Sequence, residues 1–263
     1  LKYFHNQTLA TLAPTQKVVK ELEESCYKNV SIMARGVDTS QFSPANRSAD
    51  LRKKWGADES DLVVIHVGRL AKEKNILLVL DAFRAIQKTE PTAKLVFVGD
   101  GPMRDELTKA CPQGIFCGSQ QGKSLAEHYA SADLFIFPSV TETFGNVVPE
   151  ALASGLCVVA YDYAAAGDII KHRNSGLLVP FNQSKALINT AVEAAKNSGL
   201  LKHCKQHSIS SVAKIRWESV IEELESFLYA TANGFKPIKP KSKRIRQRAI
   251  RLALHKKINL IKL

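Results

Sequence analysis

Several classes of protein are set aside by what this sequence lacks. No stretch approaches the roughly 20 consecutive apolar residues that a bilayer-spanning helix needs, and no GxSxG motif marks a nucleophilic serine. No group of His, Cys, Asp and Glu has zinc-ligand spacing, and no Asp-x-Asp pair is present to hold a magnesium–diphosphate. We therefore expect no membrane span, no metal site and no bound cofactor.

A leader segment and paired cysteines are also missing. Residue 1 is Leu rather than Met, and no secretory leader is visible, which is typical of a fragment or a processed piece. The five cysteines are odd in number and show no CxxC pair, which favours reduced, mostly buried thiols in a cytoplasmic protein. They are Cys26, Cys111, Cys117, Cys157 and Cys204.

Acidic residues are absent from the tail at positions 235–263. The net charge is +12, yet this tail alone holds eleven Lys or Arg. Subtracting those eleven leaves 26 basic against 25 acidic residues, so we expect no nucleic-acid partner for the remainder. Ile250, Leu254, Ile258 and Ile261 have helical spacing, which indicates a basic amphipathic helix. It could contact the inner face of the cytoplasmic membrane, pack on a missing domain, or remain a disordered solubilising segment.

The rest of the composition is ordinary for a globular protein, with 45% hydrophobic and 24% charged residues. Residues 1–34 hold only a strand, a helix and a strand, which is too little to bury a core, so we expect the end of a larger domain. Residues 35–50 are irregular and polar and predict an interdomain connector. A main domain at 51–232 and the basic tail at 233–263 complete the predicted organisation.

From residue 62 onwards, short apolar strands alternate with helices. The expected strands are 62–67, 95–98, 115–117, 134–137, 157–160 and 177–179, and the expected helices between and after them are 76–87, 103–109, 124–130, 147–154, 167–171, 184–197, 200–206 and 212–229. Strands that are apolar throughout favour a parallel sheet covered on both faces. The predicted fold class is α/β, a Rossmann-like doubly wound sheet followed by carboxyl-terminal helices, with ligands at the carboxyl ends of the strands.

The segment 135–160, FIFPSVTETFGNVVPEALASGLCVVA, is the most informative stretch. It predicts a buried strand, a polar loop, a helix and a second buried strand. The free N–H groups of Gly145, Asn146 and Val147 would then point out of the helix N-terminus and offer a seat for phosphate.

Two acids flank this seat, Glu142 in the loop and Glu150 in the first helical turn. An acid beside an anion site indicates a ligand that is part phosphate and part polyol. Surface carboxylates, one of them a helix cap, are the ordinary alternative. Nothing in the spacing supports a pair of glycosidase acids.

A basic loop follows the first strand of the main domain. Gly68 ends that strand, and Arg69 and Lys74 lie where two cations could neutralise a diphosphate at a helix N-terminus, or could simply be basic loop residues. Gly118 follows the third strand, where a backbone edge could meet a base or merely form a tight turn. His66 is expected in the core.

Four motifs in this order resemble the carboxyl-terminal domain of a retaining glycosyltransferase of family 4, with the GT-B fold. They are GRLxxEKN at 68–75, VGDGP at 98–102, FPSxTETFGxxxxEALASG at 137–155 and SGLLVP at 175–180. The connector GVDTSQFSP is similar to the family's interdomain segment, so the resemblance covers about residues 9 to 230. The motif TETFGN and the segment Asp162-Tyr163-Ala164-Ala165-Ala166 are most similar to bacterial transferases of sugars to lipid acceptors, GDP-mannose-dependent α-mannosyltransferases among them.

The resemblance implies a role for each site residue. Arg69 and Lys74 hold the donor diphosphate together with the backbone amides of residues 145–147. Glu150 binds the ribose hydroxyls, and Glu142 contacts the donor hexose near the reacting carbon. In front-face transfer the leaving diphosphate helps to deprotonate the acceptor, so Glu142 positions and stabilises rather than attacking.

The expected function is therefore transfer of a hexose from GDP-mannose or a UDP-hexose to an acceptor, with retention. The acceptor half is mostly missing from this sequence, so an inactive nucleotide-binding or partner-docking module is the alternative. The sequence also departs from the family's Gly-Gly pair, which is replaced by Ala165-Ala166 before Gly167-Asp168. This departure puts the sugar contacts of that loop in doubt.

Overall fold

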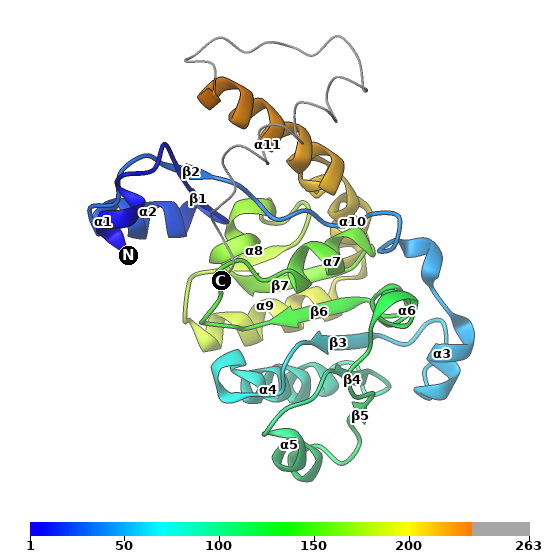
Figure 1. The fold of residues 1–263 in the computed structure, drawn as a ribbon. Coiled ribbons are helices and arrows are strands. Elements are labelled where there is room, and N and C mark those ends of the chain that lie inside the picture. The colour runs from blue at the N-terminus through cyan, green and yellow to red at the C-terminus, as the bar shows by residue number, and fades with distance from the viewer. Residues whose placement is uncertain (233–263) are drawn as a thin grey trace. The chain divides into compact units, whose positions relative to one another are not determined.

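The computed structural model describes residues 1–232, and the predicted basic tail lies outside the described residues. The chain divides into two compact units, of which the first runs from Leu1 to Trp217 and the second begins at Glu218 (Figure 1). Within residues 1–232, no helix is both long and apolar enough to cross a membrane.

The first unit is built on a parallel sheet of six strands in the order β5-β4-β3-β6-β7-β8. The strands are β3 (Val63–Val67), β4 (Lys94–Val98), β5 (Ile115–Phe116), β6 (Leu134–Phe137), β7 (Cys157–Tyr161) and β8 (Leu177–Val179). All residues of β3, β6 and β7 are buried, as expected of strands with a helix layer on each side. The predicted α/β doubly wound sheet is confirmed.

Alternate residues along each strand feed two separate cores. Val64 packs with the helices on one face, whereas Val63 and Ile65 pack with those on the other. The first face is covered by α4 (Ile76–Gln87), α5 (Arg104–Ala110) and α9 (Ser184–Lys196), and the second by α6 (Gly122–Ala130), α7 (Val147–Ala153) and α8 (Ala164–Ile169) (Figure 1).

The amino-terminal segment forms a small αβ unit with its own two-stranded parallel sheet. It comprises α1 (Lys2–His5), β1 (Thr11–Ala13), α2 (Gln16–Glu24) and β2 (Val30–Ile32). Thr15 caps α2 by accepting a hydrogen bond from the amide of Val18 at 3.3 Å. Helix α2 of this unit contacts α8 beside the main sheet.

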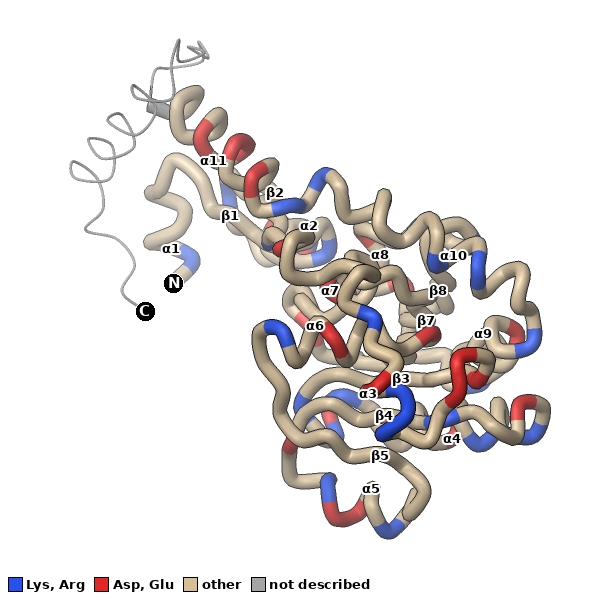
Figure 2. The backbone as a smooth tube through the Cα atoms, turned by 90° about the vertical axis from the view of Figure 1, so that its right-hand side faces the viewer, with Lys and Arg blue, Asp and Glu red and all other residues tan. Residues whose placement is uncertain are grey.

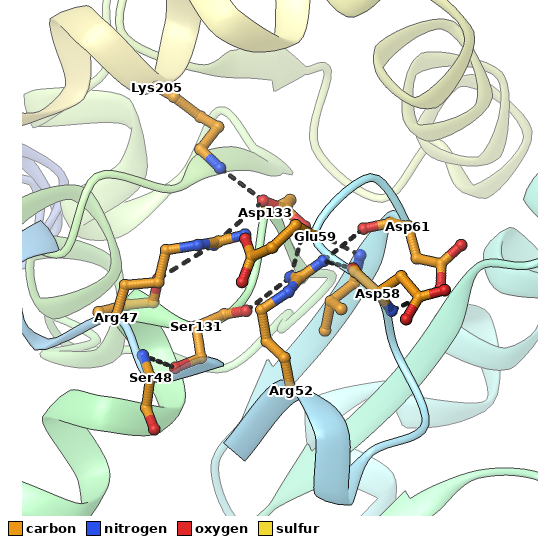
Figure 3. A network of polar contacts seen from close by, with 11 residues as sticks. Arg47, Ser48, Arg52, Asp58, Glu59, Asp61, Ser131, Asp133 and Lys205 are labelled. Carbon is orange, nitrogen blue, oxygen red and sulfur yellow. Dashed lines mark hydrogen bonds and ion pairs between the residues drawn. The ribbon is translucent and has the colours of Figure 1, made fainter. Parts of the chain in front are cut away.

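Helix α3 (Ala49–Lys54), which begins at the end of the predicted connector, was not predicted, and one residue explains its place. Arg52 is 1% exposed and donates to Asp133 at 3.1 Å and to the carbonyl of Asp58 at 2.6 Å. Asp133, just before β6, also accepts from Lys205 at 2.6 Å, and Arg47 lies 3.5 Å away (Figure 3). This network ties α3 to the amino end of the sheet and to α10 (Ser198–Ser211).

Several of the predicted helices have different bounds; the helix expected at 200–206, for example, is the longer α10. The helix expected at 167–171 begins earlier, as α8. The helix expected at 212–229 is broken into η3 (Ala213–Ile215) and α11 (Trp217–Ala232). The break occurs because Arg216 is extended and pairs with Val37 in a parallel bridge, so a tertiary contact overrides the local preference. Among the charged residues of α11 all are acidic (Figure 2).

Candidate functional site

The strand order places the candidate site at a topological switch point. From β3 the chain continues outward to β4 and β5, and from β6 it continues in the opposite direction to β7 and β8. In open α/β sheets the crevice that binds ligands lies outside the carboxyl ends of the strands at such a switch point, here β3 and β6. The basic loop and the acidic loop predicted from sequence follow these two strands.

Lys74 and Glu142 meet across this crevice. Lys74 ends the short turn η2 (Lys72–Lys74), and its ammonium donates to Oε1 of Glu142 at 2.5 Å. Ser139 donates to the same oxygen at 2.8 Å. The side chains of Lys74 and Glu142 are 21% and 12% exposed, so the pair is shielded yet reachable. An ammonium carries three donors, and hence Lys74 keeps capacity for a phosphate while it holds the acid.

Arg69 does not join this pair. Its side chain is 67% exposed and lies 3.4 Å from Glu73 on the same loop. An exposed ion pair of this kind contributes little to stability, so the guanidinium is free to change partner at small cost. The structure thus brings together one of the two predicted cations with the predicted acid, and places the other at the rim.

Glu150 is held under the site by a buried tyrosine. The hydroxyl of Tyr129, which is fully buried, donates to Oε2 of Glu150 at 3.0 Å. Burial raises the pKa of Glu150 from 4.5 to about 7, although the Tyr129 hydrogen bond opposes the rise. A carboxylate this poorly solvated gains strongly from additional hydroxyl donors, which is what a ribose supplies.

The three predicted backbone donors stand at the entrance to α7. Gly145 has φ +90° and an added Cβ would lie 3.6 Å from the Glu142 carboxyl group, so the turn keeps that acid close. Within the described part of the chain, the amides of Gly145, Asn146 and Val147 donate to no protein acceptor. These N–H groups remain available to an anion.

Gly68 and Gly118 belong to a stack of glycine turns above β3, β4 and β5. The amide of Gly68 donates to Val98, and the carbonyl of Gly118 accepts from Gly99 at 2.8 Å. A Cβ on Gly99 would lie 1.9 Å from the Gly68 carbonyl oxygen, so only glycine allows the two turns to touch. The VGDGP motif therefore supports the loop that follows β3 by backbone packing.

His66 lies in β3, and its place in the core was predicted. Its Nδ1 lies 3.1 Å from the carbonyl of Ile136, and burial lowers the pKa of the imidazole to about 4, so Nδ1 is the protonated nitrogen. Nε2 is buried without a protein partner among the described residues. Only one of the two ring nitrogens therefore has a hydrogen-bond partner among the described residues.

Sequence reasoning missed Ser139, Tyr129 and Tyr163, which all contact the two acids. Tyr163 accepts from the amide of Glu142 at 3.2 Å and donates to its carbonyl at 3.1 Å. Ser139 lies inside the quoted FPSxTETFG motif, so its place beside Glu142 carried a local signal. Tyr129 and Tyr163 approach from other parts of the chain, and no motif linked either of them to an acid.

A hollow of about 600 Å³ lies elsewhere, between α9 and α10. It is lined by Asn189, Val192, Glu193, Lys196, Asn197 and Ser198. Its acid is already engaged, since Glu193 pairs with Arg173 at 2.8 Å. Neither the free amides nor the buried acid of the switch point occur there, so we place the candidate site at the crevice.

Comparison with known proteins agrees with this architecture. Residues 48–210 match the model of the family "Glycosyl transferases group 1". Over 228 residues the chain is 36% identical to the GDP-mannose-dependent alpha-mannosyltransferase of Mycobacterium tuberculosis, covering 85% of this chain and 57% of that protein. It is 34% identical to the enzyme of the same name from Corynebacterium glutamicum, covering 85% and 53%. The chain thus spans little more than half the length of these relatives.

Solved structures share the fold at lower identity. The Anabaena HepE protein in complex with UDP superposes with a TM-score of 0.75 at 20% identity, over 86% of this chain and 65% of that one. Sucrose-phosphate synthase from Thermosynechococcus elongatus gives a TM-score of 0.73 at 23% identity, over 87% and 60%. The chain therefore belongs to the group 1 glycosyl transferases, the retaining glycosyltransferase family 4, and corresponds to the carboxyl-terminal domain of their GT-B fold.

Proposed function

We propose that this chain is the donor-binding half of an enzyme that transfers a hexose from a nucleotide-diphosphate sugar to an acceptor, with retention at the anomeric carbon. The observation that carries the proposal is the Lys74–Glu142 pair across the β3/β6 switch point, with Glu150 beneath it. A cation, two acids and a set of free amides match the three chemical parts of such a donor, namely diphosphate, hexose and ribose.

The cations, the free amides and Glu142 each act in the transfer step. Negative charge grows on the departing diphosphate, so Lys74 and the amides of Gly145, Asn146 and Val147 stabilise the transition state more than the ground state. Arg69 swings from Glu73 to the same phosphates. Lys74 gives its remaining donors to the phosphate while it still holds Oε1 of Glu142, and the second carboxylate oxygen of Glu142 accepts from the hexose hydroxyls near the reacting carbon.

We assign the ribose and the base to Glu150, Gly68 and Gly118. Glu150 accepts hydrogen bonds from the ribose hydroxyls. Gly68 and Gly118 have no side chain, so the nucleotide can approach the backbone closely there. The mannosyltransferase relatives favour GDP-mannose as the donor, and UDP-hexoses are the second candidate. We place the acceptor in a membrane lipid, for which the eleven basic residues at 235–263 supply attraction to an anionic surface.

Titration calorimetry with GDP and UDP on the full chain tests donor binding. The wild type should bind at least one of these nucleotides. We expect Lys74→Ala to weaken that binding about tenfold or more, because a charge-assisted phosphate contact is lost. The matched control is Lys72→Ala, an exposed lysine on the same turn, which should change the affinity less than twofold. Absence of binding at millimolar nucleotide by a folded chain would reject the proposal.

Transfer itself is tested by joining this chain to a complete amino-terminal domain and assaying GDP-mannose consumption with lipid acceptors. Sugar transfer that is lost in Glu142→Gln supports an enzyme. A folded protein that binds nucleotide but transfers no sugar would instead identify a docking or nucleotide-sensing module. Flotation on anionic vesicles with and without residues 235–263 tests the membrane contact, and unchanged flotation after truncation would exclude a role for the tail.

A further inference from the structure

Tyr163 brackets the backbone of Glu142 with a single hydroxyl group. The hydroxyl oxygen accepts from the Glu142 amide at 3.2 Å and the hydroxyl hydrogen is donated to the Glu142 carbonyl at 3.1 Å. The loop between β6 and α7 contains no regular structure over residues 138–146, so these two bonds fix the residue that carries the acid. The Glu142 side chain has its own contacts, with Lys74 and Ser139, which do not involve Tyr163.

The Tyr163 ring is in turn held by the amino-terminal segment. Lys17 of α2 places its ammonium 3.9 Å from the ring centroid, and Phe181 lies against the ring with a centroid distance of 4.7 Å. The same ammonium pairs with Glu21 at 3.1 Å, which fixes it above the ring face. A cation on a tyrosine face is attracted by the ring's quadrupole.

Two further bonds join the start of α2 to the acidic loop and to α8. Thr15, which is fully buried, donates to the carbonyl of Thr143 at 3.4 Å, and the amide of Gln16 donates to Asp168 at 3.0 Å. Helix α2 thus contacts the residue that follows Glu142 and the helix that follows Tyr163. The first turn of α2 is positioned to sense or set the conformation of the acidic loop.

We propose that Tyr163 is a positioning residue for Glu142, and that Lys17 couples this hold to the amino-terminal segment. Tyr163 does not touch the donor. It fixes the position of the acidic loop so that the Glu142 carboxylate contacts the hexose. The diphosphate contacts at Lys74 and the α7 entrance, and the ribose contact at Glu150, do not depend on Tyr163. The inference rests on the proposed function and adds the residue that decides how well the sugar, rather than the nucleotide, is held.

The test compares affinities for GDP with GDP-mannose, and UDP with UDP-glucose, by calorimetry on the full chain. We expect Tyr163→Phe to leave nucleotide affinity within about twofold of wild type. It should weaken the nucleotide sugar about tenfold, since the loss of two neutral hydrogen bonds corresponds to roughly a factor of ten to twenty. Lys17→Met, which keeps the aliphatic stem over the ring, should produce a smaller loss of the same kind, about threefold.

Matched control residues lie close to Tyr163 and Lys17 in the sequence. Tyr161→Phe removes a buried hydroxyl that has no partner among the described residues, and Lys20→Met removes an exposed lysine of α2 that pairs weakly with Glu24 at 3.9 Å. Both should leave the ratio of nucleotide-sugar to nucleotide affinity unchanged. A merely structural role for Tyr163 would lower both affinities together and shift the thermal midpoint, without changing their ratio.

Each outcome is decisive. An unchanged affinity ratio in a folded Tyr163→Phe protein overturns the inference while leaving donor binding intact. An altered ratio in Tyr163→Phe with no change in Lys17→Met keeps the positioning role and overturns the coupling to α2. Failure of the wild type to bind any of the four compounds overturns the proposed function, and this inference with it.

Discussion

The strongest prediction concerns Glu150, a carboxyl group whose burial opposes its ionisation. Its pKa rises from 4.5 to about 7 in the folded chain because burial penalises the charged form. Below pH 4.5 the group is protonated in both the folded and unfolded states and contributes nothing. Between pH 4.5 and 7 the unfolded state loses its proton while the folded state keeps it, so stability falls as pH rises. Above pH 7 the full cost applies, about 3 kcal/mol at about 1.4 kcal/mol per pKa unit.

Glu150→Gln removes this cost without changing the shape of the side chain. The amide oxygen can still accept from the Tyr129 hydroxyl, which bonds to the carboxylate at 3.0 Å. We expect the free energy of unfolding to increase by about 3 kcal/mol at pH 8 and to be unchanged at pH 4. Urea denaturation followed by far-UV circular dichroism at both pH values measures this difference.

The control is Glu106→Gln, an exposed carboxyl group on α5, which should change stability by no more than about 0.5 kcal/mol at either pH. Equal stabilisation by Glu150→Gln at pH 4 and pH 8 would refute the reasoning, because it would not arise from ionisation. The same variant should bind GDP or UDP about tenfold more weakly at pH 8, since hydroxyl donors bond more strongly to a carboxylate than to an amide. Wild-type affinity should rise as pH increases through 7, and that of the variant should not.

Three further predictions test the buried polar and glycine contacts of the main sheet. Asp133→Asn should lower the free energy of unfolding by about 3 kcal/mol in urea titrations, since it leaves Arg52 and Lys205 without their buried counter-charge, and a smaller loss would show that water compensates them. The stability of His66→Phe relative to the wild type should increase as pH falls from 6.5 to about 4, because unfolded histidine takes up a proton that the buried ring refuses; a difference between the two proteins that does not change with pH would contradict this. Gly99→Ala should lower the free energy of unfolding by about 3 kcal/mol, and hence the thermal midpoint by roughly six to twelve degrees, because its Cβ would lie 1.9 Å from the Gly68 carbonyl oxygen; a midpoint within two degrees of wild type would disprove the packing argument.

Sequence periodicity was enough for the fold of the main sheet. Strands such as β3 and β7 are apolar at every position, and a strand buried on both faces leaves that pattern in any sequence. Helix α3 was missed because only six residues form it and its anchor, Arg52, reads as a surface residue. Its partner Asp133 lies 81 positions away, and a contact of that range leaves no local pattern.

The candidate site shows the same division between local and distant information. Both predicted acids follow β6 at the switch point, Glu142 in the loop and Glu150 in α7, and both were found because they belong to one continuous motif. Arg69 and Lys74 looked equivalent in sequence, yet the turn η2 directs only Lys74 to Glu142. Tyr129 and Tyr163 were out of reach because each approaches its acid from a different element, 21 positions along the chain.

Amide chemical-shift mapping of the full 29.0 kDa chain during titration with GDP, or with UDP where that is the tighter ligand, tests the central claim most directly. The account predicts the largest shifts at Gly68, Lys74 and Gly118, and at the α7 entrance formed by residues 145–147. Adding GDP-mannose in place of GDP should extend the shifts to Glu142. Shifts concentrated in the hollow between α9 and α10, with the switch-point loops unchanged, would contradict the account.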